Sequence, residues 1–147
     1  MDEQEQSLRA LGAELLRLTR RGATLPPGTQ LDASVFRLLW LLAEDAEDGP
    51  EGTARTQREL ADELQLDPST ITRQVRTAIE HGLVERYDEQ GVRLLRATRA
   101  GRAAYEHDGR LRGAVYTAAL DELGPERAGR LIADLRDLND ALERQRR

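Results

Sequence analysis

The chain has 147 residues and a mass of 16.5 kDa, the size of one ordinary domain with its own hydrophobic core. It contains no cysteine, which excludes disulfides, thiolate metal sites and cysteine-based redox sensing. Its basic residues are all arginine, and the net charge is −5, so the whole surface is not a general trap for nucleic acid. The acidic, polar first residues and the lack of any long apolar run predict a cytoplasmic protein without membrane contact.

The N-terminal third of the chain predicts two helices of different character. The first, over residues 8–22, carries leucines at spacings of three and four, which form one apolar stripe. The second follows Asp32, a favourable N-cap residue, and ends before an acidic loop at residues 47–52. It is apolar around most of its circumference, so we expect it at the centre of the fold. The stripe of the first helix consists of Leu8, Leu11, Leu15 and Leu18.

Residues 56–82 predict a helix-turn-helix. Thr56 begins a capping box, in which its hydroxyl accepts from the amide of Glu59 and Glu59 reaches back to the cap. After a tight turn, Asp67 caps a second short helix that Gly82 terminates. Two short helices joined in this way are the helix-turn-helix arrangement. The apolar residues of the second helix that we expect to face the core are Ile71, Val75 and Ile79.

A β-hairpin and two further helices are predicted to follow. Two β-like runs, 83–87 and 92–97, are separated by a four-residue turn that contains a glycine. A helix-turn-helix followed directly by a hairpin is a winged helix. Thr98 then caps a long helix, and Pro125 opens the last one. The last helix has an apolar stripe formed by Leu131, Leu135, Leu138 and Leu142.

The sequence therefore predicts a mainly α fold with a small β-hairpin wing. We expect a single domain over residues 1–147, in which a winged helix-turn-helix core at 32–98 is flanked by the dimerisation helices of 1–31 and 99–147. Both leucine stripes lie outside the small core, which cannot cover two more apolar faces. A two-fold interface between two copies is the favoured use of the stripes, and packing within one subunit is the alternative.

Three stretches of the sequence are similar to one known family. TQRELADELQLDPSTITRQVRTAIEHGLVER, at residues 56–86, resembles the winged-helix core of the MarR family of bacterial transcription regulators. ATRAGRAAYE, at residues 97–106, and LGPERAGRLIADLRDL, at residues 123–138, resemble that family's entry into helix five and its closing dimer helix. The resemblance implies a homodimeric repressor that binds a palindromic operator in double-stranded DNA, needs no cofactor and is released by a small-molecule effector.

The second helix of the helix-turn-helix carries short hydroxyl side chains and arginines opposite its apolar face. These residue types reach base edges and phosphates, and the start of such a helix normally enters the major groove. The resemblance implies base reading near the helix start, and phosphate contact further along and at the preceding helix start. The implied base readers are Ser69, Thr70, Thr72 and Arg73, and the implied phosphate contacts are Arg76, Thr77, Thr56 and Gln57.

The hairpin departs from the family's pattern. The family's wing carries an arginine at its tip, which enters the minor groove, whereas residues 89–91 of this chain read Glu-Gln-Gly. Arg86 and Arg93, in the flanking strands, are the expected substitutes. Residues 68–102 hold seven arginines and four acidic residues, which suits a DNA-facing surface but also fits ordinary surface variation.

Four aromatic residues are candidates for an effector pocket. Tyr105 and Tyr116 are eleven residues apart, so they lie on nearly the same helix face, and Phe36 and Trp40 share a face of the second helix. The alternative is that these side chains are plain core.

Other functions have less support in the sequence. Neither histidine has a partner at metal-ligand spacing, and no nucleophile–base pair or phosphate-binding glycine loop is present, so we expect neither an enzyme nor a metal site. A winged-helix module that binds protein instead of DNA is the alternative function. The acidic net charge and the missing wing arginine favour that alternative.

Overall fold

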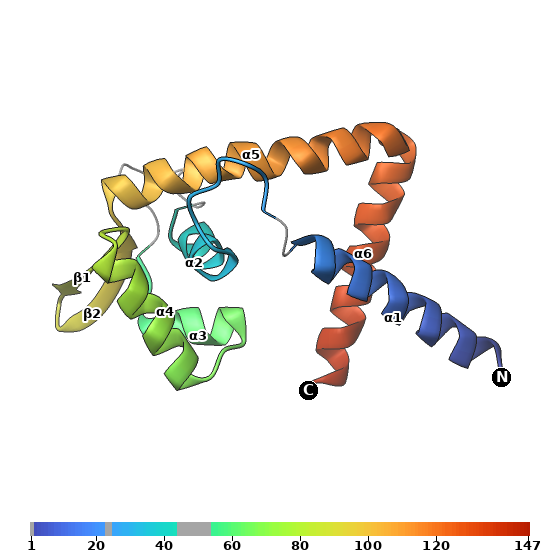
Figure 1. The fold of residues 1–147 in the computed structure, drawn as a ribbon. Helices are drawn as coiled ribbons and strands as arrows, with labels where there is room; N and C mark the ends of the chain where they lie inside the picture. The colour runs from blue at the N-terminus through green and yellow to red at the C-terminus, as the bar shows by residue number, and fades with distance from the viewer. Residues whose placement is uncertain (1, 23–24, 44–53) are drawn as a thin grey trace. The chain divides into compact units, whose positions relative to one another are not determined.

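The structure, a computed structural model, describes residues 2–22, 25–43 and 54–147 (Figure 1). The acidic loop expected at residues 47–52 lies outside this part of the chain. The described elements are α1 (Glu3–Gly22), α2 (Ala33–Ala43), α3 (Gln57–Leu64), α4 (Pro68–Glu80), β1 (Val84–Glu89), β2 (Val92–Ala97), α5 (Arg99–Leu123) and α6 (Pro125–Gln145). This order confirms the mainly α fold with a hairpin wing. Among the described helices, none combines the length and apolar character that crossing a bilayer requires.

The chain forms two compact units, Met1–Gly109 and Arg110–Arg147, and the boundary lies inside α5. The first part of α5 belongs to the winged-helix unit, because Ala104 and Tyr105 pack against its core. The expected division of the chain at residue 98 therefore does not coincide with a boundary between compact units.

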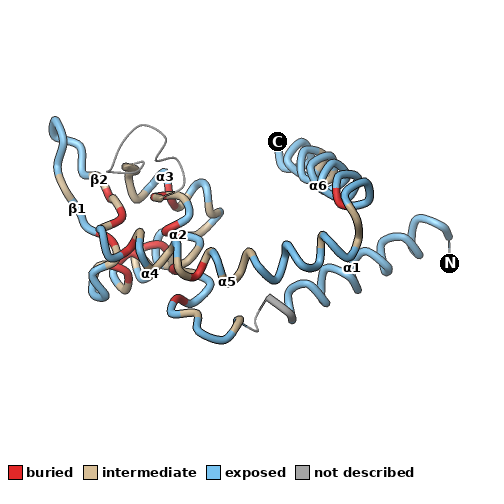
Figure 2. The backbone as a smooth tube through the Cα atoms, turned by 90° about the horizontal axis from the view of Figure 1, so that it is seen from above, coloured by how far each residue is buried: buried red, intermediate tan, exposed pale blue. Residues whose placement is uncertain are grey.

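Helix α2 lies at the centre of the first unit, as its apolar circumference predicts. Leu38, Leu39 and Leu42 have no exposed surface, and the helix contacts both α4 and β2. Buried residues gather in this region in Figure 2. Trp40 is an exception, since 47% of its surface is exposed. The other fully or almost fully buried side chains include Leu60, Ile71, Val75, Val84 and Leu95.

Side-chain caps define the two helices of the helix-turn-helix. The Thr56 hydroxyl oxygen accepts from the Glu59 amide at 3.1 Å, as expected. The Glu59 carboxylate accepts from the Thr56 hydroxyl, also at 3.1 Å, and the predicted return bond to the Thr56 amide is not recorded, so half of the capping box forms. The turn after α3 places Gln65 in the left-handed region, with φ 54°, and lets the Leu66 amide donate to the Ala61 carbonyl.

Helix α4 packs on the core through a slightly different stripe from the one predicted. Ile71 and Val75 are buried as expected, but the third buried residue is Ala78, and Ile79 is only partly buried. At 3.6 residues per turn, residue 78 falls closer to the line through 71 and 75 than residue 79 does. The inward direction of the face is confirmed, Ile79 packs on the core at its edge, and Ala78 is a further buried member that was not predicted.

The hairpin is longer and its turn tighter than predicted. Strand β1 begins at Val84 and pairs as far as Glu89, opposite Val92, which leaves a two-residue turn in place of the expected four. Gln90 and Gly91 both have positive φ, 50° and 79°, the conformation of a type I′ turn that matches the twist of paired strands. On the other edge of β2, Arg55 exchanges two backbone hydrogen bonds with Leu95, a pairing that the sequence pattern did not predict.

Candidate nucleic-acid interface

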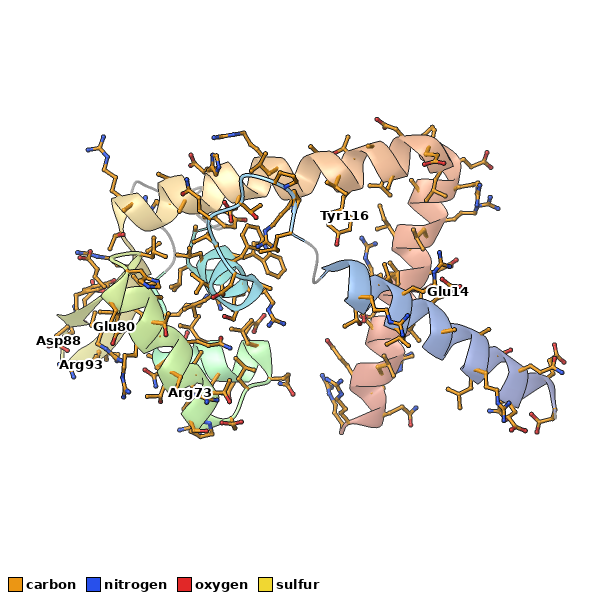
Figure 3. All side chains as sticks on the ribbon, viewed as in Figure 1. Glu14, Arg73, Glu80, Asp88, Arg93 and Tyr116 are labelled. Atoms are coloured by element: carbon orange, nitrogen blue, oxygen red, sulfur yellow. The ribbon has the colours of Figure 1, made fainter. Side chains whose placement is uncertain are left out.

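Of the six α4 side chains proposed for DNA contact, three are exposed and three are half-buried. Arg73 and Arg76 are exposed, and within the described residues no ion pair engages either of them. Figure 3 places Arg73 toward the N-terminal end of α4 and Glu80 at the other end, with Asp88 and Arg93 on the hairpin. Of the remaining four, Ser69 is exposed, and Thr70, Thr72 and Thr77 are half-buried.

The first hydroxyls of α4 already donate to the N-cap carboxylate. Ser69 Oγ lies 2.6 Å from Asp67 Oδ1, and Thr70 Oγ1 lies 3.0 Å from Asp67 Oδ2. These hydrogen bonds, with one from the Thr70 amide, lower the pKa of Asp67 to about 2, so the carboxylate is ionised at neutral pH. An ionised carboxylate only accepts, so each hydroxyl uses its single proton here. Both oxygens therefore present only lone pairs to an approaching duplex.

Thr72 follows the same pattern one turn later. Its hydroxyl donates to the Pro68 carbonyl at 2.7 Å and accepts from Nε2 of Gln57 at 3.0 Å. Only one lone pair and the methyl group remain for an outside partner. The half-buried Thr72 side chain can thus meet a base by accepting a hydrogen bond or by apolar contact.

Gln57 is engaged at both ends of its side-chain amide. While Nε2 donates to Thr72, Oε1 accepts from Nη2 of Arg86 at 3.2 Å. The Thr56 hydroxyl is also used inside the protein, by Glu59. The phosphate contact proposed at this helix start would therefore involve backbone amides, and it stays a prediction.

The arginines of the hairpin have different partners. Arg93 Nε lies 3.6 Å from Asp88 Oδ1 across the strands, in a pair that is largely exposed and contributes little to stability. Arg96 lies closer to its acidic partner than Arg93 does, with Nε 2.6 Å from Glu85 Oε1. Its guanidinium also lies over the Tyr87 ring, 4.3 Å from the ring centroid. The sequence pattern did not predict the contacts of Arg96. The strand register places it directly opposite Glu85, which carries the opposite charge.

Of the four proposed effector residues, the structure brings two together. The rings of Phe36 and Tyr105 have centroids 5.2 Å apart and pack on the core. Trp40 is exposed, and Tyr116, which is 65% exposed, belongs to the second unit. A pocket of all four stays a prediction.

A different set of residues lines a small open cavity of about 270 Å³ in the first unit. It lies between the start of α2, the end of α4 and the first part of α5, and none of the four aromatic residues borders it. The lining residues are Gln30, Leu31, Asp32, Val35, His81, Leu83 and Ala104.

Each of the two histidines has a position in the fold that its local structure explains. His81 is the C-cap residue of α4, and Nε2 of His107 lies 3.0 Å from the Gly28 carbonyl oxygen. Across the described residues, no group of three or more potential ligand side chains is arranged to hold a metal ion.

The fold agrees with comparisons to known proteins. Residues 29–93 match the model of a family described as MarR family. Over these residues, the chain is similar to the MarR family. No curated protein sequence gives a significant match.

Solved structures of MarR proteins are similar over nearly the whole chain. A MarR family protein from Bacillus stearothermophilus is 26% identical, with a TM-score of 0.66 over 97% of this chain and 99% of that one. A mutant MarR from E. coli, solved with operator DNA, is 19% identical, with a TM-score of 0.73 over 93% and 99% of the two chains. The PcaV transcriptional regulator from Streptomyces coelicolor, solved with its natural ligand, is 23% identical, with a TM-score of 0.64 over 89% and 92%.

Proposed function

We propose that this protein is a DNA-binding transcription regulator of the MarR family, and that its helix α4 enters the major groove. The observation that carries the proposal is the division of α4 into two faces. Ile71, Val75 and Ala78 anchor one face in the core, and Arg73 and Arg76 extend from the other without ion-pair partners among the described residues. A helix presenting guanidinium groups in this way can bind guanine edges and phosphates. This role is consistent with a cytoplasmic protein.

The hydrogen bonds that the α4 side chains already make within the protein narrow the set of bases that this helix would read. Arg73 can donate two parallel hydrogen bonds to O6 and N7 of guanine. Ser69, Thr70 and Thr72 use their hydroxyl protons inside the protein, so they would accept hydrogen bonds instead. In the major groove the donors are N4 of cytosine and N6 of adenine. We therefore expect a half-site in which guanine, facing Arg73, lies beside bases that carry these amino groups.

We expect the protein to act as a homodimer. The symmetry of its DNA site is the most direct test of this expectation. Leucines along α1 are exposed in the single chain, as Figure 2 shows for that helix, and α6 has a second exposed apolar row. Rows of this size on a water-facing helix are typical of surfaces that another protein covers. The residues proposed for the interface are Leu8, Leu11, Leu15 and Leu18 on α1, with Leu131, Leu135, Leu138 and Leu142 on α6.

Repression of a palindromic operator and release by a small molecule complete the proposal. The structural relative PcaV was solved with its natural ligand, and the E. coli relative was solved with operator DNA. In this chain, the Phe36–Tyr105 pair and the exposed Trp40 remain the proposed effector contacts. They are part of α2 and α5, through which a bound ligand would displace the helix-turn-helix.

Selection of bound duplexes from a random DNA pool tests the proposed function. We expect a palindrome whose half-sites are about one helical turn, or 10–10.5 base pairs, apart. Binding to the recovered duplex should weaken steeply with salt, with a log–log slope of about −0.9 for each phosphate neutralised. Recovery of no consensus, together with a flat salt response, would contradict DNA binding and favour the alternative of a protein-binding winged helix.

A further inference from the structure

The side chain of Gln57 connects three elements of the winged helix. It begins α3, its Nε2 donates to Thr72 on α4, and its Oε1 accepts from Arg86 on β1. The two distances are 3.0 and 3.2 Å. Thr72 and Arg86 are among the proposed DNA contacts, so Gln57 links a residue on the proposed reading helix to one on the wing.

The chemistry of Arg86 fixes which way the Gln57 amide points. A guanidinium only donates, so the amide oxygen of Gln57 must face Arg86 Nη2, and a reversed amide would place two donors together there. The NH₂ group therefore faces Thr72, whose hydroxyl oxygen accepts from it while donating its own proton to the Pro68 carbonyl, 2.7 Å away.

Arg86 differs from the other two arginines of the hairpin. Arg93 lies beside Asp88, and Arg96 binds Glu85, so an acidic neighbour offsets the charge of each. For Arg86, in contrast, the partner recorded within the described residues is the neutral amide of Gln57. Its full charge and its remaining N–H groups stay available to a phosphate or a base edge.

We infer that Gln57 is a positioning residue that holds the Arg86 guanidinium at the start of α3, where Gln57 also binds Thr72 of α4, so that the wing contacts DNA through the strand residue Arg86 and not through its tip. This inference rests on the proposed function. It accounts for a hairpin whose tip, Gln90-Gly91, carries no arginine. A long, flexible side chain loses conformational entropy when it binds, and the bond to Gln57 restrains Arg86 before DNA arrives.

A double-mutant cycle tests this role, with the duplex that the wild-type protein recovers from a random pool as the probe. Gln57→Ala should weaken binding roughly 2- to 10-fold, the range expected for one hydrogen bond. In the Arg86→Ala background, the same change should have almost no further effect, because the group that it positions is absent. Arg93→Ala is the matched control, since Arg93 has no recorded bond to Gln57, and there the full loss should remain. Thermal unfolding of each variant checks that the fold is intact.

The outcomes separate the possible roles. An equal loss for Gln57→Ala with and without Arg86 would mean that Gln57 acts through Thr72 or contacts DNA itself, and would overturn the inference. Equal coupling to Arg86 and Arg93 would also overturn it, because a general distortion of the hairpin would affect both arginines. Failure of the wild-type protein to select any duplex would overturn the proposed function first, and the inference with it.

Discussion

Gly101→Ala is expected to destabilise the winged-helix unit by at least about 2 kcal/mol, although alanine is the better helix former. A Cβ at this position would lie 2.9 Å from the carbonyl carbon of Leu83 and closer still to its oxygen. Both are backbone atoms, which cannot rotate away as a side chain can. The Leu83 carbonyl also accepts from the Thr98 amide at 3.0 Å, so a shift of Leu83 would strain the start of α5.

The matched control for this change is Gly109→Ala in the same helix. Apart from its chain neighbours and the backbone of its own helix, a Cβ on Gly109 would have no atom within 4 Å, so the substitution should stabilise the protein by about 0.5–1 kcal/mol. Thermal unfolding followed by circular dichroism should show a midpoint lower by roughly 4–8 °C for Gly101→Ala and raised for Gly109→Ala. Equal stability of the two variants would show that α5 does not approach Leu83 as described.

Asp108→Ala is expected to cost about 2–4 kcal/mol, because it removes a buried carboxylate that accepts from two backbone amides. Asp108 has no exposed surface, and it accepts from the Gln30 amide at 2.9 Å and from the Leu31 amide at 2.8 Å. These bonds attach the segment before α2 to α5. Asp108→Asn should cost less, because its one carbonyl oxygen can still accept.

Asp121→Ala provides the comparison, because Asp121 is an exposed carboxylate on the same helix. Its removal should change the free energy of unfolding by no more than about 0.5 kcal/mol. Urea denaturation measures all three variants. If Asp108→Ala and Asp121→Ala unfold at the same urea concentration, Asp108 is not the acceptor that holds Gln30 and Leu31.

Features set by neighbouring residues could be predicted from the sequence. Asp67 and Thr98 cap their helices with the expected bonds, to the Thr70 amide at 2.8 Å and the Gly101 amide at 3.0 Å. Such caps depend on residues three positions apart, so the sequence pattern contains the relevant information. The inward stripe of α4 was predictable for the same reason, because helical geometry relates its members. Ile79 packs on the core at the edge of this stripe, and Ala78, which is fully buried beside it, was not predicted.

Features that depend on contacts between distant segments could not be predicted. Asp108 lies 77 residues from Leu31, and nothing in its local pattern separates a buried acceptor from a surface aspartate. The bonds from Gln57 to Thr72 and Arg86 likewise exist only once α3, α4 and β1 are packed. The hairpin turn was misjudged because Asp88 and Glu89 are residue types that strands disfavour, yet the type I′ turn at Gln90-Gly91 extends the pairing through them.

Arg73→Ala, measured on the selected duplex and on a random duplex of equal length, tests most directly whether the outward face of α4 reads sequence. We expect a loss of about 1–3 kcal/mol on the selected duplex, a relaxed preference at one base position, and a much smaller loss on random DNA. Arg76→Ala, the nearest arginine on the same helix, should weaken both complexes alike, as a phosphate contact does. Equal losses on the two duplexes for Arg73→Ala would contradict a reading role for this face.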